Sequence, residues 1–190
     1  RYRAFLVVDE AHALGVFGPQ GAGLCAAAHV MPDVLLGTFG KAVGTHGAFA
    51  AGSQLLRTFL WNRARTFVFS TASSPELCAR THAHLQATRE ADARRAALAA
   101  RCAALRQELA AQQVPVVAGS FGPIVPVLVG SSARATRVAS ALRERGILAQ
   151  PIRPPTVPEG TARIRITVSE RWADTRVGYL ARCIGEACRA

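Results

Sequence analysis

The chain has 190 residues, half of them hydrophobic, and a formal net charge of +11 at neutral pH. This length and apolar content suffice for a buried core in one domain or two small ones. No apolar run approaches the roughly 20 residues of a membrane-spanning helix, so we expect no membrane segment. The five cysteines form no CxxC pair. This argues against a disulfide or metal framework and favours a cytoplasmic location.

The basic charge alone does not predict a nucleic-acid partner. The arginines are scattered, and many alternate with alanine in a helical pattern that is typical of a solvated face. Aromatic residues make up only 6% of the chain, so few side chains can stack on bases. We therefore expect no nucleic-acid ligand. The first residues also run directly into a predicted buried strand, without an initiator Met or a signal-peptide cleavage site, so we expect a fragment that begins inside a fold.

The first half of the chain alternates short apolar runs with helical patterns, which predicts an α/β fold with a largely parallel sheet. A helix is predicted at residues 53–63. A Ser/Thr cluster before Pro75 predicts the start of a second helix, which runs to about Gln112 either continuously or with one break. Strands are predicted at residues 5–8 and 34–36, which we expect to be buried, and at residues 46–51 and 66–69.

After Pro115 the pattern becomes that of a compact α+β lobe. Gly146 is predicted to end the first helix of this lobe. We expect two domains, residues 1–95 and 96–190, with a long linking helix that begins in the first. The predicted elements of the second lobe are strands at 124–129, 147–150 and 163–168, and helices at 133–145 and 175–188.

Lys41 is the only lysine among 23 basic residues, and it follows a predicted strand in Gly37-Thr38-Phe39-Gly40-Lys41. Codon bias toward GC-rich sequence accounts for the scarcity of lysine elsewhere, but not for this position between glycines. A guanidinium can supply charge and hydrogen bonds, but it stays protonated and does not form an imine with a carbonyl. Lys41 is therefore our candidate for amine chemistry.

Three further polar residues lie close to predicted strand ends. Asp9 ends an apolar run, where a carboxylate needs a cationic partner such as a protonated ring nitrogen, or instead caps a helix. His12 lies near enough to reach the same ligand, or is an ordinary turn histidine. Thr38 could place its hydroxyl on an anion near Lys41, or serve in a turn.

Two other segments have a distinctive composition. Glycines follow His12 at positions 15, 18, 21 and 23. Their spacing is not a dinucleotide fingerprint, so we predict a flexible loop near a site. Arg153 precedes Pro154 and Pro155, which stiffen the backbone and suit a carboxylate clamp, or a rigid connector with a surface arginine.

Together these motifs resemble the α-oxoamine synthases of the aspartate aminotransferase superfamily, and within them the branch that serves biotin biosynthesis. The resemblance covers nearly the whole chain in order, and it implies that the first half of such an enzyme is absent. It also implies part of a pyridoxal-phosphate-dependent transferase large domain followed by a small C-terminal α+β domain. The matching segments are DEAH at 9–12, TFGK at 38–41, FST at 69–71, RPPTVP at 153–158 and GTARIR at 160–165.

The resemblance implies pyridoxal 5'-phosphate as cofactor, with a role for each matching residue. Lys41 would carry it as a Schiff base, Asp9 would pair with its pyridinium nitrogen and His12 would bond its phenolic oxygen. Thr38 would lie at the cofactor phosphate. Ser70 and Thr71 would reach a phosphate across a homodimer interface. Arg153 would bind the substrate carboxylate, with Thr156 beside it as a second substrate-binding residue.

The implied reaction is the decarboxylative condensation of L-alanine with a pimeloyl thioester of coenzyme A or acyl carrier protein, releasing CO2 and the free thiol. Lys41 would remove the α-proton of alanine. The absent half would supply the aromatic residue that stacks on the cofactor and further acyl contacts, so we expect this fragment alone to be inactive. His46 receives no role.

Three alternatives stay open from the sequence. Glycine C-acetyltransferase, 5-aminolevulinate synthase and serine palmitoyltransferase share the lysine, aspartate and histidine, although Arg153-Pro154-Pro155 favours the biotin branch. A DEAH-type nucleic-acid ATPase would need its phosphate-loop lysine before the DEAH run, whereas Lys41 comes after it and is followed by Ala42. A non-catalytic remnant is disfavoured by the presence of Asp9, Lys41 and Arg153.

Overall fold

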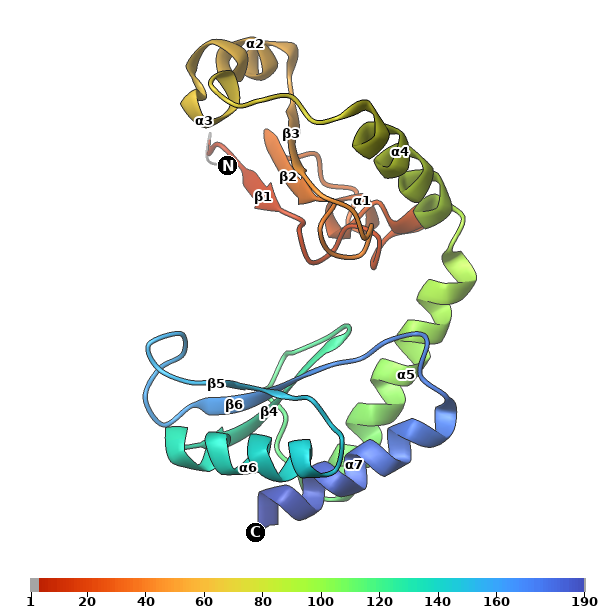
Figure 1. The fold of residues 1–190 in the computed structure, drawn as a ribbon, viewed down its shortest axis with the longest axis vertical. Helices are drawn as coiled ribbons and strands as arrows, with labels where there is room; N and C mark the ends of the chain where they lie inside the picture. The colour runs from red at the N-terminus through yellow and green to blue at the C-terminus, as the bar shows by residue number, and fades with distance from the viewer. Residues whose placement is uncertain (1–3, 190) are drawn as a thin grey trace. The chain divides into compact units, whose positions relative to one another are not determined.

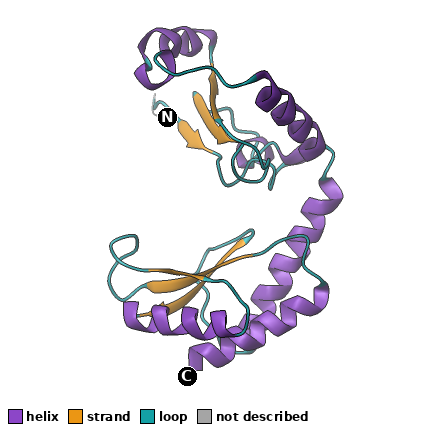
Figure 2. Cartoon of the chain, viewed as in Figure 1, coloured by secondary structure: helices purple, strands orange, loops and turns teal. Residues whose placement is uncertain are grey.

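The computed structural model describes residues 4–189. It divides between Arg95 and Ala96 into two compact units, which we call the first and the second unit. Each unit has a three-stranded sheet of its own, and helices flank the strands in both (Figures 1 and 2). The described residues therefore form an α/β structure, as the sequence predicts.

The sheet of the first unit has the order β1-β2-β3, with β1 at Val7–Asp9, β2 at Val34–Thr38 and β3 at Ala48–Gly52. β1 and β2 are parallel, whereas β2 and β3 are antiparallel. The short connection at residues 39–47 permits the antiparallel pair, since parallel neighbours need a longer crossover. Among the described strands of the first unit, the predicted parallel arrangement thus holds for one of the two pairs.

The apolar side chains of Phe5, Leu6 and Val7, which lead into β1, are exposed. Phe5 is 68% exposed and Val7 is 53% exposed, so the predicted burial of this strand is wrong for the described structure. β1 lies at the edge of the sheet and pairs only with β2 among the described strands. Its apolar composition suits burial on both faces, but no described layer covers it.

Two helices of the first unit begin at a serine cap. Ser53 Oγ accepts a hydrogen bond from the Leu56 amide at 3.2 Å at the start of α2 (Gln54–Arg63), and Ser74 caps α4 (Pro75–Arg89) in the same way. Two short helical turns, η1 (Pro19–Gly21) and α1 (Leu24–Ala27), lie in the glycine-rich segment.

The strand predicted at residues 66–69 is wrong, because this segment forms α3 (Arg65–Val68). The Val68 amide donates to the Ala64 carbonyl at 2.9 Å, and the Phe69 amide donates to the Arg65 carbonyl at 3.1 Å. A strand can satisfy its backbone only through a neighbouring strand, whereas a helical turn does so locally. Aromatic and β-branched residues are therefore an insufficient signal here.

The predicted long helix is broken once, between α4 and α5 (Asp92–Ala111). The Arg95 guanidinium donates to the Thr88 carbonyl at 2.6 Å and to the Arg89 carbonyl at 3.2 Å, and it pairs with Asp92 at 2.6 Å. These carbonyls belong to the last turn of α4, whose acceptors have no partner within the helix. Arg95 thus stabilises the break between α4 and α5, where the sequence contains neither Gly nor Pro.

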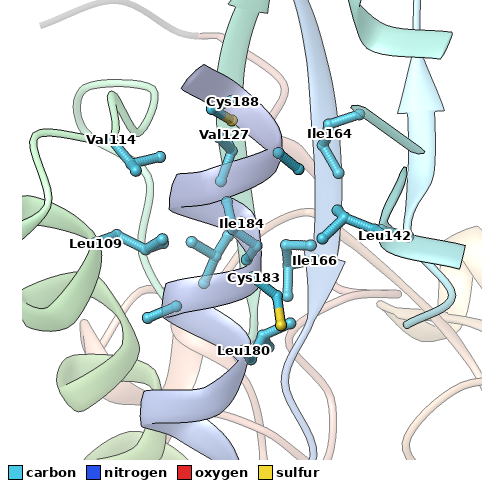
Figure 3. Packing of buried hydrophobic residues seen from close by; sticks show 14 of the residues in the cluster. Leu109, Val114, Val127, Leu142, Ile164, Ile166, Leu180, Cys183, Ile184 and Cys188 are labelled. Carbon is cyan, nitrogen blue, oxygen red and sulfur yellow. The ribbon is translucent and has the colours of Figure 1, made fainter. Parts of the chain in front are cut away.

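The second unit contains an antiparallel sheet of order β4-β6-β5. Alternate residues of the strands at residues 124–130 and 162–167 are buried, as expected when one face packs against helices. Figure 3 shows apolar side chains from the strands and helices converging in one core. The elements are β4 (Ile124–Gly130), α6 (Ser132–Glu144), β5 (Gln150–Ile152), β6 (Ala162–Thr167) and α7 (Asp174–Arg189).

β5 begins three residues later than the strand predicted at 147–150. The Ile147 amide donates to the Leu142 carbonyl at 2.9 Å, and the Gly146 amide donates to the Arg143 carbonyl at 2.9 Å. Gly146 has φ +73°, as the residue after a helix end commonly does. The helix exit therefore occupies residues that the apolar pattern assigns to the strand.

Leu142→Ala tests the core of the second unit, because Leu142 is fully buried. We expect a loss of about 2–5 kcal/mol in unfolding free energy from lost burial and the residual cavity. Hydrogen exchange of the β6 and α7 amides measures it. Leu148→Ala is the matched control, since Leu148 is 87% exposed. Equal exchange in the two variants would contradict this view of the core.

Candidate active site

Four of the predicted site residues emerge at one edge of the first sheet. Asp9 ends β1 and pairs in register with Leu36 of β2, so the strand ends that carry Asp9 and Thr38 lie at the same edge. Lys41 follows in the turn after β2, and His12 follows in the turn after β1. The carboxyl ends of parallel strands are the usual ligand-binding edge of α/β sheets.

Lys41 lies in a tight turn with its side chain exposed. The Gly44 amide donates to the Lys41 carbonyl at 3.1 Å. Thr38 closes the base of the connection, because its hydroxyl donates to the Gly47 carbonyl at 3.0 Å and accepts from the Gly40 amide at 3.2 Å. Thr38 therefore shapes the loop that carries Lys41 and keeps one oxygen lone pair for a further donor.

Asp9 is exposed rather than buried, contrary to the expectation from its apolar neighbours. Its Oδ1 accepts a hydrogen bond from the Ala11 amide at 2.8 Å, which closes the turn that leads to His12. An ionised carboxylate accepts about four hydrogen bonds. Asp9 thus retains capacity to bind a cationic ring nitrogen at the sheet edge.

Glu10 is a buried residue at this edge for which the sequence motif alone gave no role. It is 2% exposed, and its two carboxylate oxygens accept hydrogen bonds from the Leu24 amide at 3.0 Å and the Cys25 amide at 2.6 Å. A Cβ on Gly23 would lie 2.8 Å from the Glu10 carboxyl carbon. Glu10 therefore fastens the glycine-rich segment to the end of β1. A carboxylate beside a strand end and a downstream glycine is the signal that could have predicted this role.

The thiol of Cys25 is affected by the same contact. Partial burial raises the pKa of Cys25, and its hydrogen bond with the Glu10 carboxylate and the negative charge of that group raise this pKa further. The thiol is therefore kept protonated at neutral pH. Such a thiol is a poor nucleophile.

The glycine-rich loop contacts the lysine turn directly. The Gly15 amide donates to the Gly21 carbonyl at 2.7 Å, which closes the loop. Gly15 has φ +80°, and a Cβ at this position would lie 2.9 Å from the Ala42 Cβ. The loop that the sequence predicts to be flexible is thus tied by hydrogen bonds and packs against the residue after Lys41.

Ser70 and Thr71 follow α3 in the first unit, and both are exposed. Ser70 Oγ donates to the Phe67 carbonyl at 2.7 Å. The hydroxyl therefore caps the preceding helical turn and can still accept a hydrogen bond.

Arg153 and Thr156 belong to the second unit and lie in the turn after β5. The Thr156 amide donates to the Arg153 carbonyl at 3.0 Å, while the Arg153 guanidinium contacts Thr136 Oγ1 at 3.5 Å. This contact is long for a hydrogen bond. The exposed guanidinium is thus held by the stiff turn rather than by a strong side-chain partner.

A cavity of about 420 Å³ lies beside β5 in the second unit. Two arginines line it, Arg143 and Arg165, together with Thr167. The Arg165 Nε is buried and has no hydrogen-bond partner among the described residues. Leaving a buried donor of a cationic side chain without an acceptor costs free energy. Arg165 belongs to the GTARIR run, but the sequence alone assigns it no role.

Two classes of site are not found within residues 4–189. No three or more His, Cys, Asp or Glu residues gather as they would to hold a metal ion. In the same part of the chain, no helix combines the length and apolar character needed to cross a bilayer.

Glu10→Gln tests the fastening of the glycine-rich loop. An amide side chain presents one acceptor oxygen, so one of the two backbone amides loses its acceptor at a cost of about 1–3 kcal/mol. We expect faster hydrogen exchange at residues 15–25. Glu90→Gln is the control, because Glu90 is exposed on the same unit. Unchanged exchange at residues 15–25 in Glu10→Gln would contradict the assignment.

Comparison with known proteins finds relatives and structural neighbours along nearly the whole chain. The chain is 48% identical over 184 residues to 8-amino-7-oxononanoate synthase of Anaeromyxobacter dehalogenans strain 2CP-C, a match that covers 95% of this chain and 46% of the relative. The chain thus spans about half the length of the curated relatives it matches.

Solved structures show the same fold. A high-resolution structure of SPT with a PLP (pyridoxal phosphate) internal aldimine matches with a TM-score of 0.88 at 26% identity, over 96% of this chain and 47% of that one. The 8-amino-7-oxononanoate synthase of Francisella tularensis matches with a TM-score of 0.86 at 22% identity, over 95% of this chain and 53% of that one. The family model for aminotransferase class I and II matches residues 1–181. The chain therefore belongs to the class I and II aminotransferase family.

Proposed function

We propose that this chain is part of an 8-amino-7-oxononanoate synthase, which condenses L-alanine with a pimeloyl thioester and releases CO2 and the free thiol. The observation that carries the proposal is the position of Lys41, the only lysine of the chain, at the same sheet edge as Asp9. The 48% identity to a synthase of this name supports the choice within the family. We also propose that the enzyme is a homodimer and acts in the cytoplasm.

The side chains at the sheet edge fit pyridoxal 5'-phosphate, the cofactor that the family and a PLP-bound neighbour indicate. Lys41 offers an exposed amine for the aldehyde carbon. Asp9 offers a carboxylate with free acceptor capacity for the ring nitrogen. His12 would bond the ring oxygen, and Thr38 would lie at the phosphate.

When bound, pyridoxal phosphate supplies a ring that withdraws electrons from the substrate α-carbon. The Asp9 carboxylate would hold a proton on the ring nitrogen, because a nearby negative charge favours the cationic form. The Lys41 amine would take the α-proton of L-alanine, since a general base must stand within hydrogen-bond reach of the proton it removes. Exposure of Lys41 leaves its side chain able to approach the substrate.

The second unit would contribute substrate recognition. Arg153 would bind the carboxylate of L-alanine through paired N–H donors, a geometry that a guanidinium provides and an ammonium does not. Thr156 would bind the substrate beside Arg153. We also propose that residues 1–95 and 96–190 form parts of the large and the small domain, and that Ser70 and Thr71 reach a phosphate across the dimer interface.

Another α-oxoamine synthase is the second candidate. Structures of serine palmitoyltransferase match this chain at 26–28% identity, which is higher than the 22% of the synthase from Francisella tularensis. These enzymes differ in amino acid and acyl donor, so the substrate pair decides between the candidates. The donor would be pimeloyl-coenzyme A or pimeloyl-acyl carrier protein.

Lys41→Arg in the full-length protein tests the role of the amine, because arginine keeps the charge but forms no imine. We expect thiol release from pimeloyl-coenzyme A with L-alanine to fall by about 10²–10⁴-fold or more, as expected on loss of a general base. A thiol-reactive dye follows the release, and Arg63→Lys is the control on an exposed helix end.

Two outcomes would contradict parts of the proposal. Thiol release by Lys41→Arg at the wild-type rate would remove the lysine from the mechanism. Thiol release by the wild type from L-serine and palmitoyl-coenzyme A, with none from L-alanine and either pimeloyl donor, would favour the second candidate.

A further inference from the structure

Helix α4 contacts the turn that follows Lys41 at two points. His84 Nδ1 lies 2.8 Å from the Val43 carbonyl oxygen. One turn of helix earlier, Thr81 Oγ1 donates to Thr45 Oγ1 at 3.2 Å. Both contacts join residues far apart in the sequence, so they fix the position of the turn relative to α4.

The contact from His84 has a defined direction. A carbonyl oxygen can only accept, so Nδ1 of His84 must carry the proton. The neutral ring is therefore the Nδ1–H tautomer, and the doubly protonated ring donates in the same way. The acceptor belongs to Val43, which is 4% exposed, so a shift of the turn would also disturb a buried side chain.

The turn is held from a second direction by the glycine-rich loop. Gly15 packs against Ala42 so closely that a Cβ would lie 2.9 Å from the Ala42 Cβ. Ala42 and Val43, the two residues after Lys41, are thus restrained by different elements, while the Lys41 side chain is exposed. This combination fixes the backbone of a reactive amine and leaves its side chain free to move.

We propose that His84 is a positioning residue for Lys41: its Nδ1–H bond to the Val43 carbonyl sets the place from which the amine reaches cofactor and substrate. The inference rests on the proposed function, and it adds a residue outside all the segments that carry the sequence resemblance. His84 touches neither cofactor nor substrate in this role. Misplacing a reacting group by about 1 Å can cost about 10²-fold in rate.

The test uses the full-length protein with pyridoxal phosphate and three variants. His84→Ala removes the donor. His84→Asn retains a side-chain N–H close to the position of Nδ1, so it is the conservative rescue. His82→Ala is the matched control, because His82 is an exposed histidine on the same helix. Visible circular dichroism of the bound cofactor reports how rigidly it is held, and hydrogen exchange at residues 42–45 reports the turn without the cofactor.

We expect His84→Ala to bind pyridoxal phosphate with a weakened visible circular dichroism signal, and to lose about 10–100-fold in kcat with a smaller change in KM. Exchange at residues 42–45 should accelerate. His84→Asn should recover most of each property, and His82→Ala should match the wild type.

Three results would overturn the inference. His84→Ala could behave as the wild type in dichroism and exchange, or His84→Asn could be as impaired as His84→Ala, which would mean that ring packing matters rather than the donor. If His84→Ala does not fold, Thr81→Val removes the neighbouring contact of α4 with the lysine turn. Unchanged exchange and dichroism in Thr81→Val would also count against positioning of the turn by α4. A wild-type protein that binds no pyridoxal phosphate would instead refute the proposed function. Exchange at residues 42–45 would still show whether His84 restrains the turn.

Discussion

The buried carboxylate of Glu10 is the interaction on which the candidate site depends. It satisfies the Leu24 and Cys25 amides and closes the glycine-rich segment against the end of β1. Earlier in the same segment, Gly15 packs against Ala42. Removing water from a carboxylate is costly unless hydrogen bonds replace it. The buried Glu10 carboxylate therefore needs the two amides as donors, and the two amides need it as their acceptor. The pairing of β1 with β2 brings Asp9 and the strand that leads to Lys41 to one edge, and the Glu10 contact fixes the glycine-rich segment beside them.

The same edge combines a restrained backbone with exposed reactive groups. His84 and Gly15 restrain the lysine turn, whereas the side chains of Asp9 and Lys41 face solvent. Restraint of the backbone reduces the entropy lost when a reacting group is oriented. Exposure also extends to the apolar side chains of β1. The chain spans about half the length of its curated relatives.

Much of the fold follows from local signals in the sequence. The helix starts predicted near Ser53 and Pro75 match α2 and α4, and the strands predicted at residues 124–129 and 163–168 match β4 and β6. The sequence analysis fails where distant partners decide. Residues 66–69 have strand composition but form a helical turn, because no described strand pairs with them. The family motifs predict Lys41 and Asp9 as candidates. The roles of Glu10 and His84 are visible only in the structure, where each contacts a residue distant in sequence: Cys25 for Glu10 and Val43 for His84.

The most direct test of the account is to reduce the full-length protein with borohydride in the presence of pyridoxal phosphate and to map the modified peptide by mass spectrometry. Borohydride turns an imine between lysine and the cofactor into a stable amine, so the label records which lysine forms the bond. The account predicts stoichiometric labelling of Lys41 that L-alanine diminishes. Labelling of other lysines with Lys41 unmodified, or no labelling of the protein, would contradict the assignment of Lys41 as the reactive amine.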